Sequence, residues 1–337
     1  MNAMNELQLR WLCNETICGL DISWRQIQSI EYPTLRTMCA AIRAAGQPEA
    51  IALPNSEQFH LDSDQGDEYL IQISWPLHWQ DVHTTERSAV PMIYIVDGNA
   101  LFLSATEVAW RRSAASHFVG GGIVVAVGYP LTQGKLYDTQ RRSLDLTPPS
   151  ATPIEGYGGA DRFLDFIEAK VRPAVRDRLP KVTVSREALY GHSYGGLFAL
   201  HALFSRPLSF DCFMASSPSI WWNSRRVLHE AKAFLEQEPN SEEAKKPSLM
   251  LFLGALEQHP PRWDNEPLDH FEARKQIAKD LRMEDNLLDL CKMLKGCDRL
   301  HTIQKNLYEL EEHTSVMACS MSRSLTNFFE DWPFHPS

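Results

Sequence analysis

The chemistry in this sequence centres on Ser193, which lies in the run Gly191-His192-Ser193-Tyr194-Gly195 and fits the pattern G-x-S-x-G. A serine hydroxyl is a weak nucleophile until a base removes its proton, and an imidazole does so best when a third group fixes its tautomer. We therefore expect an acid and then a histidine downstream of Ser193. His192 points to the other side of this turn and is expected to be structural.

The expected base is His313, which lies in the run "YELEEHTSV". A short strand-like stretch and an acidic loop precede it, and Thr314 and Ser315 signal the start of a helix directly after it. A histidine on such a loop, at the edge of a sheet, is free to reach a serine on a neighbouring turn.

The acid is open between several carboxylates. Glu257 follows the apolar run "LMLFLGAL" and so stands at a predicted strand end, where its carboxylate would accept the imidazole N–H. Asp264 and Glu266 follow in the same loop and are alternatives. A serine-histidine dyad without any acid is the third possibility.

The negative charge that develops on an ester oxygen needs two backbone N–H donors. Tyr194, directly after the serine, is the first expected donor. The second is expected from Gly98 or Asn99, which follow the apolar run "MIYIV". The alternative for Asp97-Gly98 is an ordinary turn.

These residues need a scaffold, and apolar runs alternate with helical patterns along the chain. Strands are expected at 69–79, 92–102, 122–130, 210–222 and 248–257, with another that ends near Tyr190; helices are expected at 159–179 and 197–204. This alternation predicts an α/β fold with a mostly parallel sheet covered by helices on both faces. Residues 1–50 are expected to be an N-terminal helical extension, 51–337 the main domain, and about 258–300 an insertion near the C-terminal edge of the sheet.

Composition limits the partners. The chain has 337 residues, and its 33 basic against 43 acidic residues give a formal charge of −10, which argues against nucleic acid or an anionic membrane. No window approaches 18 uninterrupted apolar residues, so no membrane span is expected. The seven scattered cysteines indicate reduced thiols and a cytoplasmic location. No cofactor and no metal site are expected, because the spacing of Cys291, Cys297 and His301 is loose for zinc.

Seven blocks, among them "YIVDGNALF", "RRSLDLTPP", "GHSYGGLFAL", "ASSPSIWW" and "EEHTSV", resemble the "Putative esterase" family of α/β-hydrolases. The resemblance covers about residues 52–332 and is strongest to the siderophore-esterase branch, which includes the salmochelin and enterobactin trilactone esterases and the fungal triacetylfusarinine esterases. It implies an α/β-hydrolase fold in which Ser193 is the nucleophile, His313 the base, and Tyr194 with Gly98 or Asn99 the oxyanion donors.

The resemblance also suggests residues that bind the substrate. Arg142 stands in a block similar to the family's R-x-x-D-Y-T-P and is expected to contact the substrate, although Leu146 replaces the usual tyrosine. Trp221 and Trp222 are expected to line the pocket, with core packing as the alternative.

The predicted activity is hydrolysis of carboxylic esters through an acyl-enzyme, with small siderophore-type hydroxamate or catecholate esters or lactones as substrates. The alternative is a biosynthetic acyl-transfer enzyme with the same serine and histidine, which would act on an acyl thioester, with an acyl carrier protein as partner, and hydrolyse it or form a lactone. A binding protein that keeps the fold without catalysis is the third hypothesis.

Overall fold

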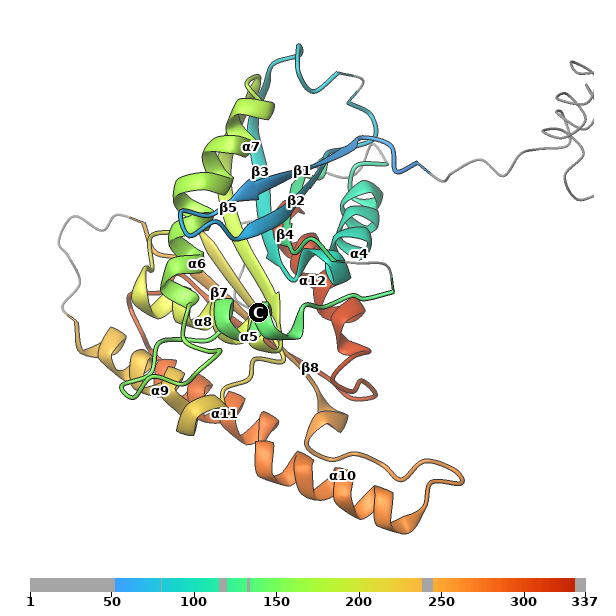
Figure 1. The fold of residues 1–337 in the computed structure, drawn as a ribbon, viewed down its shortest axis with the longest axis vertical. Helices are drawn as coiled ribbons and strands as arrows, with labels where there is room; N and C mark the ends of the chain where they lie inside the picture. Colours follow the sequence, from blue (N-terminus) through green and yellow to red (C-terminus); the bar gives the residue numbers. More distant parts are fainter. Residues whose placement is uncertain (1–51, 80, 115–119, 132–133, 238–244, 331–337) are drawn as a thin grey trace, which may run out of the picture. The chain divides into compact units, whose positions relative to one another are not determined.

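A computed structural model describes residues 52–79, 81–114, 120–131, 134–237 and 245–330 of the chain (Figure 1). Residues Pro54–Ser337 form one compact unit, and everything described below belongs to it. The helical extension predicted for residues 1–50 lies outside the described residues. The division into extension and main domain therefore stays a prediction.

The described residues contain an eight-stranded sheet with the order β1-β2-β4-β3-β5-β6-β7-β8. The pairings from β4 to β8 along this order are all parallel, whereas β1 pairs with β2, and β2 with β4, in antiparallel fashion. This confirms the mostly parallel sheet expected from the sequence. The strands are β1 Ser56–Asp62, β2 Glu68–Ser74, β3 Arg87–Val96, β4 Ile123–Gly128, β5 Val182–His192, β6 Cys212–Ser216, β7 Ser248–Gly254 and β8 Ile303–Tyr308.

Helices cover both faces of the sheet (Figure 1). Helices α4 and α12 pack together on one face, and α6, α8 and α9 lie on the other. The α-helices are α4 Gly98–Arg111, α5 Thr139–Asp145, α6 Ala160–Phe166, α7 Arg172–Arg178, α8 Tyr194–Ser205, α9 Trp222–Glu236, α10 Leu268–Leu281, α11 Met283–Leu294 and α12 Val316–Glu330. A π-helical turn at Ile167–Val171 joins α6 to α7, and a 3-10 turn at Ala255–Glu257 follows β7.

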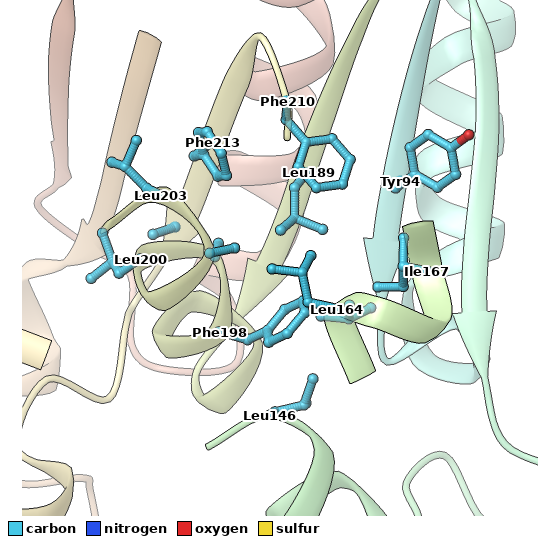
Figure 2. Packing of buried hydrophobic residues seen from close by; sticks show 14 of the residues in the cluster. Tyr94, Leu146, Leu164, Ile167, Leu189, Phe198, Leu200, Leu203, Phe210 and Phe213 are labelled. Carbon is cyan, nitrogen blue, oxygen red and sulfur yellow. The ribbon is translucent and has the colours of Figure 1, made fainter. Parts of the chain in front are cut away.

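The core lies between the central strands and these helices. Strands β4, β6 and β7 are buried along their whole length, as expected for strands covered on both faces. Figure 2 shows Phe198 and Leu203 of α8 against Leu189 of β5 and Phe213 of β6. This packing fixes helix α8, and therefore the turn at its N-terminus, against the sheet.

All five strands predicted with both bounds end earlier than the sequence suggested. The strands expected at 69–79 and 122–130 end at Ser74 and Gly128. The strand expected at 92–102 ends at Val96, because Asp97 has a left-handed backbone (φ 56°) and α4 begins at Gly98. The strands expected at 210–222 and 248–257 end at Ser216 and Gly254. In each case apolar residues continue beyond the strand into the following turn or helix.

The segment between β7 and β8 contains α10 and α11, in the region predicted as an insertion. Almost every residue of α10 is at least partly exposed, and Ala278 is its one buried residue. In the part of the chain that the structure describes, no helix combines the length and hydropathy needed to cross a bilayer.

Candidate active site

Ser193 occupies the tight turn between strand β5 and helix α8. Its backbone is strained for a non-glycine residue, with φ 59° and ψ −116°. A Cβ on Gly191 would lie 2.1 Å from the carbonyl oxygen of Gly195, and a Cβ on Gly195 would lie 2.9 Å from a methyl group of Val96. Only glycine therefore fits on either side of the serine, and the Ser193 amide donates a hydrogen bond to the carbonyl oxygen of Ser216 (2.9 Å).

A chain of two hydrogen bonds links Ser193, His313 and Glu257. The Oγ atom of Ser193 lies 3.1 Å from Nε2 of His313, and Nδ1 of His313 lies 2.6 Å from Oε2 of Glu257. The imidazole side chain is 41% exposed, while the carboxylate is 1% exposed. The three residues follow β5, β8 and β7, whose carboxyl ends meet at one edge because these strands are parallel.

The Glu257 carboxylate is held by two further donors. Its Oε1 atom accepts hydrogen bonds from the hydroxyl of Ser217 (2.5 Å) and the amide of Gly254 (2.8 Å). Glu266, by contrast, is bound by Arg274, and Asp264 is exposed. Of the three carboxylates that the sequence left open, Glu257 is the one whose side chain reaches the histidine.

His192 holds the loop that carries His313. Its Nε2–H donates to the carbonyl oxygen of His313 (2.7 Å), and the two rings lie 4.6 Å apart between centroids. Burial of the His192 ring, together with the nearby His313, lowers the pKa of His192 to about 3. A ring that stays neutral keeps this hydrogen-bonded geometry, which agrees with the structural role expected for His192.

The expected oxyanion donors both stand at helix starts. Gly98 is the first residue of α4, Tyr194 is the first residue of α8, and first-turn N–H groups have no partner inside their own helix. The side chain of Asn99 binds both backbone groups of Tyr129, at 2.8 and 2.9 Å, so it ties the start of α4 to the end of β4. A Cβ on Gly195 would lie 3.7 Å from Oδ2 of Asp97, so the two helix starts are neighbours.

Arg142 is engaged by other protein groups. Its Nε and Nη2 atoms donate to the two carboxylate oxygens of Asp97, at 3.0 and 2.9 Å. Its guanidinium carbon lies 5.2 Å from the ring centroid of Tyr137 and 5.4 Å from that of Tyr194. The resemblance suggested a substrate contact at Arg142, but the structure shows the bonds of this side chain directed to Asp97.

The two tryptophans have different surroundings. The ring of Trp221 is half-buried and lies 6.0 Å from the Tyr194 ring. Trp222 is buried and packs 6.2 Å from Tyr157. Trp221 therefore borders the serine turn, whereas Trp222 follows the alternative of core packing.

The sequence analysis did not identify two residues that lie near the serine. Asp97 was treated only as part of a turn, and Ser217 was not considered, although each follows the end of an apolar strand.

A cavity of about 720 Å³ lies along Leu131 and residues 135–140, and Tyr137 in its wall contacts Arg142. Among the described residues, no group of three or more His, Cys, Asp and Glu side chains could hold a metal ion.

Comparisons with known proteins identify the family of the chain. The model of the Esterase family, described as "Putative esterase", matches residues 64–285. The chain belongs to this family and is an ester hydrolase with the α/β-hydrolase fold, which confirms the resemblance seen in the sequence.

The chain is similar to several proteins named as siderophore esterases or hydrolases. It is 67% identical to the siderophore triacetylfusarinine C esterase of Aspergillus fumigatus over 291 residues, which cover 86% of this chain and 99% of the relative. It is 41% identical to the siderophore enterobactin esterase of Emericella nidulans, over 80% of this chain and 92% of the relative. The solved structure of the siderophore hydrolase EstB from Aspergillus nidulans has a TM-score of 0.82 and 58% identity, and the match covers 86% of this chain and all of that one.

Proposed function

We propose that the chain hydrolyses siderophore ester bonds, with Ser193 as nucleophile, His313 as general base and Glu257 as the acid that orients the histidine. The continuous chain of hydrogen bonds from Ser193 Oγ through the imidazole to the buried carboxylate supports these roles. Glu257 accepts a hydrogen bond from the Nδ1–H of His313, so Nε2 carries no proton and can take the proton of the serine hydroxyl.

The proposed reaction has two steps. Ser193 Oγ attacks the ester carbonyl carbon while His313 takes its proton, and the histidine then gives this proton to the departing alcohol. Water, deprotonated by the same imidazole, attacks the acyl-enzyme; the bond to Ser193 Oγ breaks, the acid is released, and the imidazolium returns the proton to the serine oxygen. The Tyr194 and Gly98 amides are the proposed donors to the oxygen that becomes negative in each step.

The substrate class comes from the relatives, which are named as esterases of triacetylfusarinine C and enterobactin. These names do not favour the alternative of acyl transfer from a carrier protein. We also propose a reducing, cytoplasmic compartment, which the free thiols of Cys212, Cys291, Cys297 and Cys319 support.

Product analysis with Ser193→Ala as control tests the proposal. The protein is incubated with a hydroxamate trilactone and a catecholate trilactone, each iron-free and ferric, and with acyl thioesters, and the products are read by mass spectrometry. We expect linear hydroxy acids from a trilactone, and a rate at least about 1,000-fold lower for Ser193→Ala. Inert trilactones together with a cyclic product from a thioester would replace the proposal with the acyl-transfer alternative.

A further inference from the structure

One ion pair contacts both of the helix starts that border Ser193. Asp97 immediately precedes Gly98, the first residue of α4, and its side chain is 3% exposed. Arg142, on α5, is 15% exposed and grips both carboxylate oxygens. The carbon atom of the same guanidinium lies over the ring of Tyr194, the first residue of α8, 5.4 Å from its centroid. The pair therefore spans the two residues whose amides are the proposed oxyanion donors.

Asp97 has an unusual backbone conformation. Its backbone is left-handed, with φ 56° and ψ 42°, which costs energy for a residue with a Cβ. A two-point hydrogen bond between a planar guanidinium and a carboxylate fixes orientation as well as distance. Because Asp97 and Gly98 share a peptide group, this clamp sets the direction of the Gly98 N–H.

Charge gives a second reason for the pair. The Asp97 carboxylate lies within 3.7 Å of a Cβ position on Gly195, one residue beyond Tyr194. A buried carboxylate without a partner at this distance would repel the negative charge that forms on the substrate oxygen. The Arg142 guanidinium neutralises it.

We infer that Arg142 is a positioning residue for the oxyanion hole, acting through Asp97, and not a contact for the substrate. The inference rests on the proposed function, since it requires an oxyanion next to Ser193. It replaces the substrate contact that the family resemblance suggested. The two roles predict changes in different kinetic constants. Loss of a substrate contact raises KM, whereas displacement of an oxyanion donor lowers kcat.

Steady-state kinetics of the full chain with a small p-nitrophenyl ester separate the two roles. Arg142→Lys keeps the positive charge but cannot form the two-point hydrogen bond to the carboxylate. Asp97→Asn keeps the shape of the side chain but loses its negative charge. We expect kcat to fall about 10- to 1,000-fold in both variants, with KM within about threefold of the unchanged protein. The control Arg141→Gln removes one charge from the same helix, where Arg141 binds the carbonyl oxygen of Glu68, and should keep kcat.

Inhibition by a trifluoromethyl ketone distinguishes a role in positioning the oxyanion donors from a purely structural role, which would leave the inhibition constant unchanged. This compound forms a tetrahedral oxyanion with the active serine, so its inhibition constant should rise by the same factor by which kcat/KM falls in Arg142→Lys. The corresponding alcohol, which cannot form the oxyanion, should bind unchanged. An increase in KM with unchanged kcat would overturn the inference, and so would equal weakening of ketone and alcohol.

The Ser193→Ala variant distinguishes failure of the proposed function from failure of the inference about Arg142. Activity that survives in Ser193→Ala would remove the proposed function, and the inference with it. Activity that is lost in Ser193→Ala while Arg142→Lys and Asp97→Asn keep kcat would overturn the inference alone. Thermal unfolding of each variant shows whether a fall in kcat reflects fewer folded molecules, and kcat is then expressed per folded molecule.

Discussion

At the scale of single residues, the site depends on how firmly Glu257 is held. Its carboxylate accepts three hydrogen bonds, from His313, Ser217 and the amide of Gly254. The His313 side chain, by contrast, is 41% exposed, so a substrate can reach it. The firmly held acid keeps the imidazole oriented while it first receives and then returns the proton.

Glu257→Gln tests the acid directly. The amide keeps the shape of the side chain but loses the charge that stabilises the imidazolium, so we expect kcat to fall about 100- to 10,000-fold with little change in KM. Kinetics with a p-nitrophenyl ester measure this. Glu266→Gln is the matched control, since Glu266 binds Arg274, and should keep kcat. Full activity in Glu257→Gln would show that a serine-histidine dyad suffices.

The sequence left the acid open for a physical reason. Glu257, Asp264 and Glu266 lie in one segment after one strand, and chain spacing does not say which side chain turns inward. The 3-10 turn at Ala255–Glu257 and the donors Ser217 and Gly254 make that choice. The clamp between Asp97 and Arg142 was missed likewise, because it joins residues from separate elements.

At the scale of elements, a buried histidine ties together three helices that surround the site. His201 of α8 is 3% exposed and contacts Glu230 of α9 at 2.9 Å and Asp161 of α6 at 3.1 Å. Burial alone would lower the pKa of His201, but hydrogen bonds to Asp161 and Glu230 raise it to about 9. The charged ring therefore stabilises the packing of α6 and α9 against the helix that begins after Ser193.

The pH dependence of stability follows from this raised pKa. Because the pKa of His201 is higher in the folded chain than its usual value of 6.5, its stabilisation is complete below about pH 6.5 and is lost as the pH rises through about 9. His201→Gln should lower the free energy of unfolding by about 2 kcal/mol at pH 6 and by much less at pH 10. Urea unfolding at both pH values measures this, with His229→Gln, an exposed histidine of α9, as control.

If the free energies of unfolding of the wild type and His201→Gln differ by the same amount at pH 6 and pH 10, this account is wrong. The loss would then come from packing around the ring, which does not depend on pH.

Most of the sheet was predictable, and the errors have two origins. Buried strands such as β4 are continuous apolar runs that the sequence displays directly. The predicted strand ends ran too far because Leu101 and Phe102 of α4 are as apolar as the strand before them. Strand β1 was missed because it lies at the edge of the sheet, where none of its residues is fully buried and hydrophobic alternation is weak.

At the scale of the whole molecule, the sheet, the core and the site all lie within the unit that begins at Pro54. The solved structure of the Aspergillus nidulans siderophore hydrolase is matched completely by 86% of this chain. Its fold therefore needs no counterpart of the remaining residues.

Deletion of Met1–Leu53 is the corresponding test. The shortened chain keeps Asn55, whose side chain binds the carbonyl oxygens of Pro76 and Trp79 before β1 begins. We expect its melting temperature to stay within about 4 °C and its kcat within about twofold of the full chain. A larger loss, measured by thermal unfolding and ester kinetics, would show that the first 53 residues contribute to the fold or the site.

The position of His313 beyond β8 has a consequence for biosynthesis. Among the described strands, β8 pairs with β7 alone, and the residues that follow it supply His313, the proposed base, and helix α12. A nascent chain that has already folded its first seven strands around Ser193 therefore still lacks the proposed base. If His313 is the base, as proposed, the protein can become an esterase only after β8 and His313 have left the ribosome and docked on the edge of the sheet.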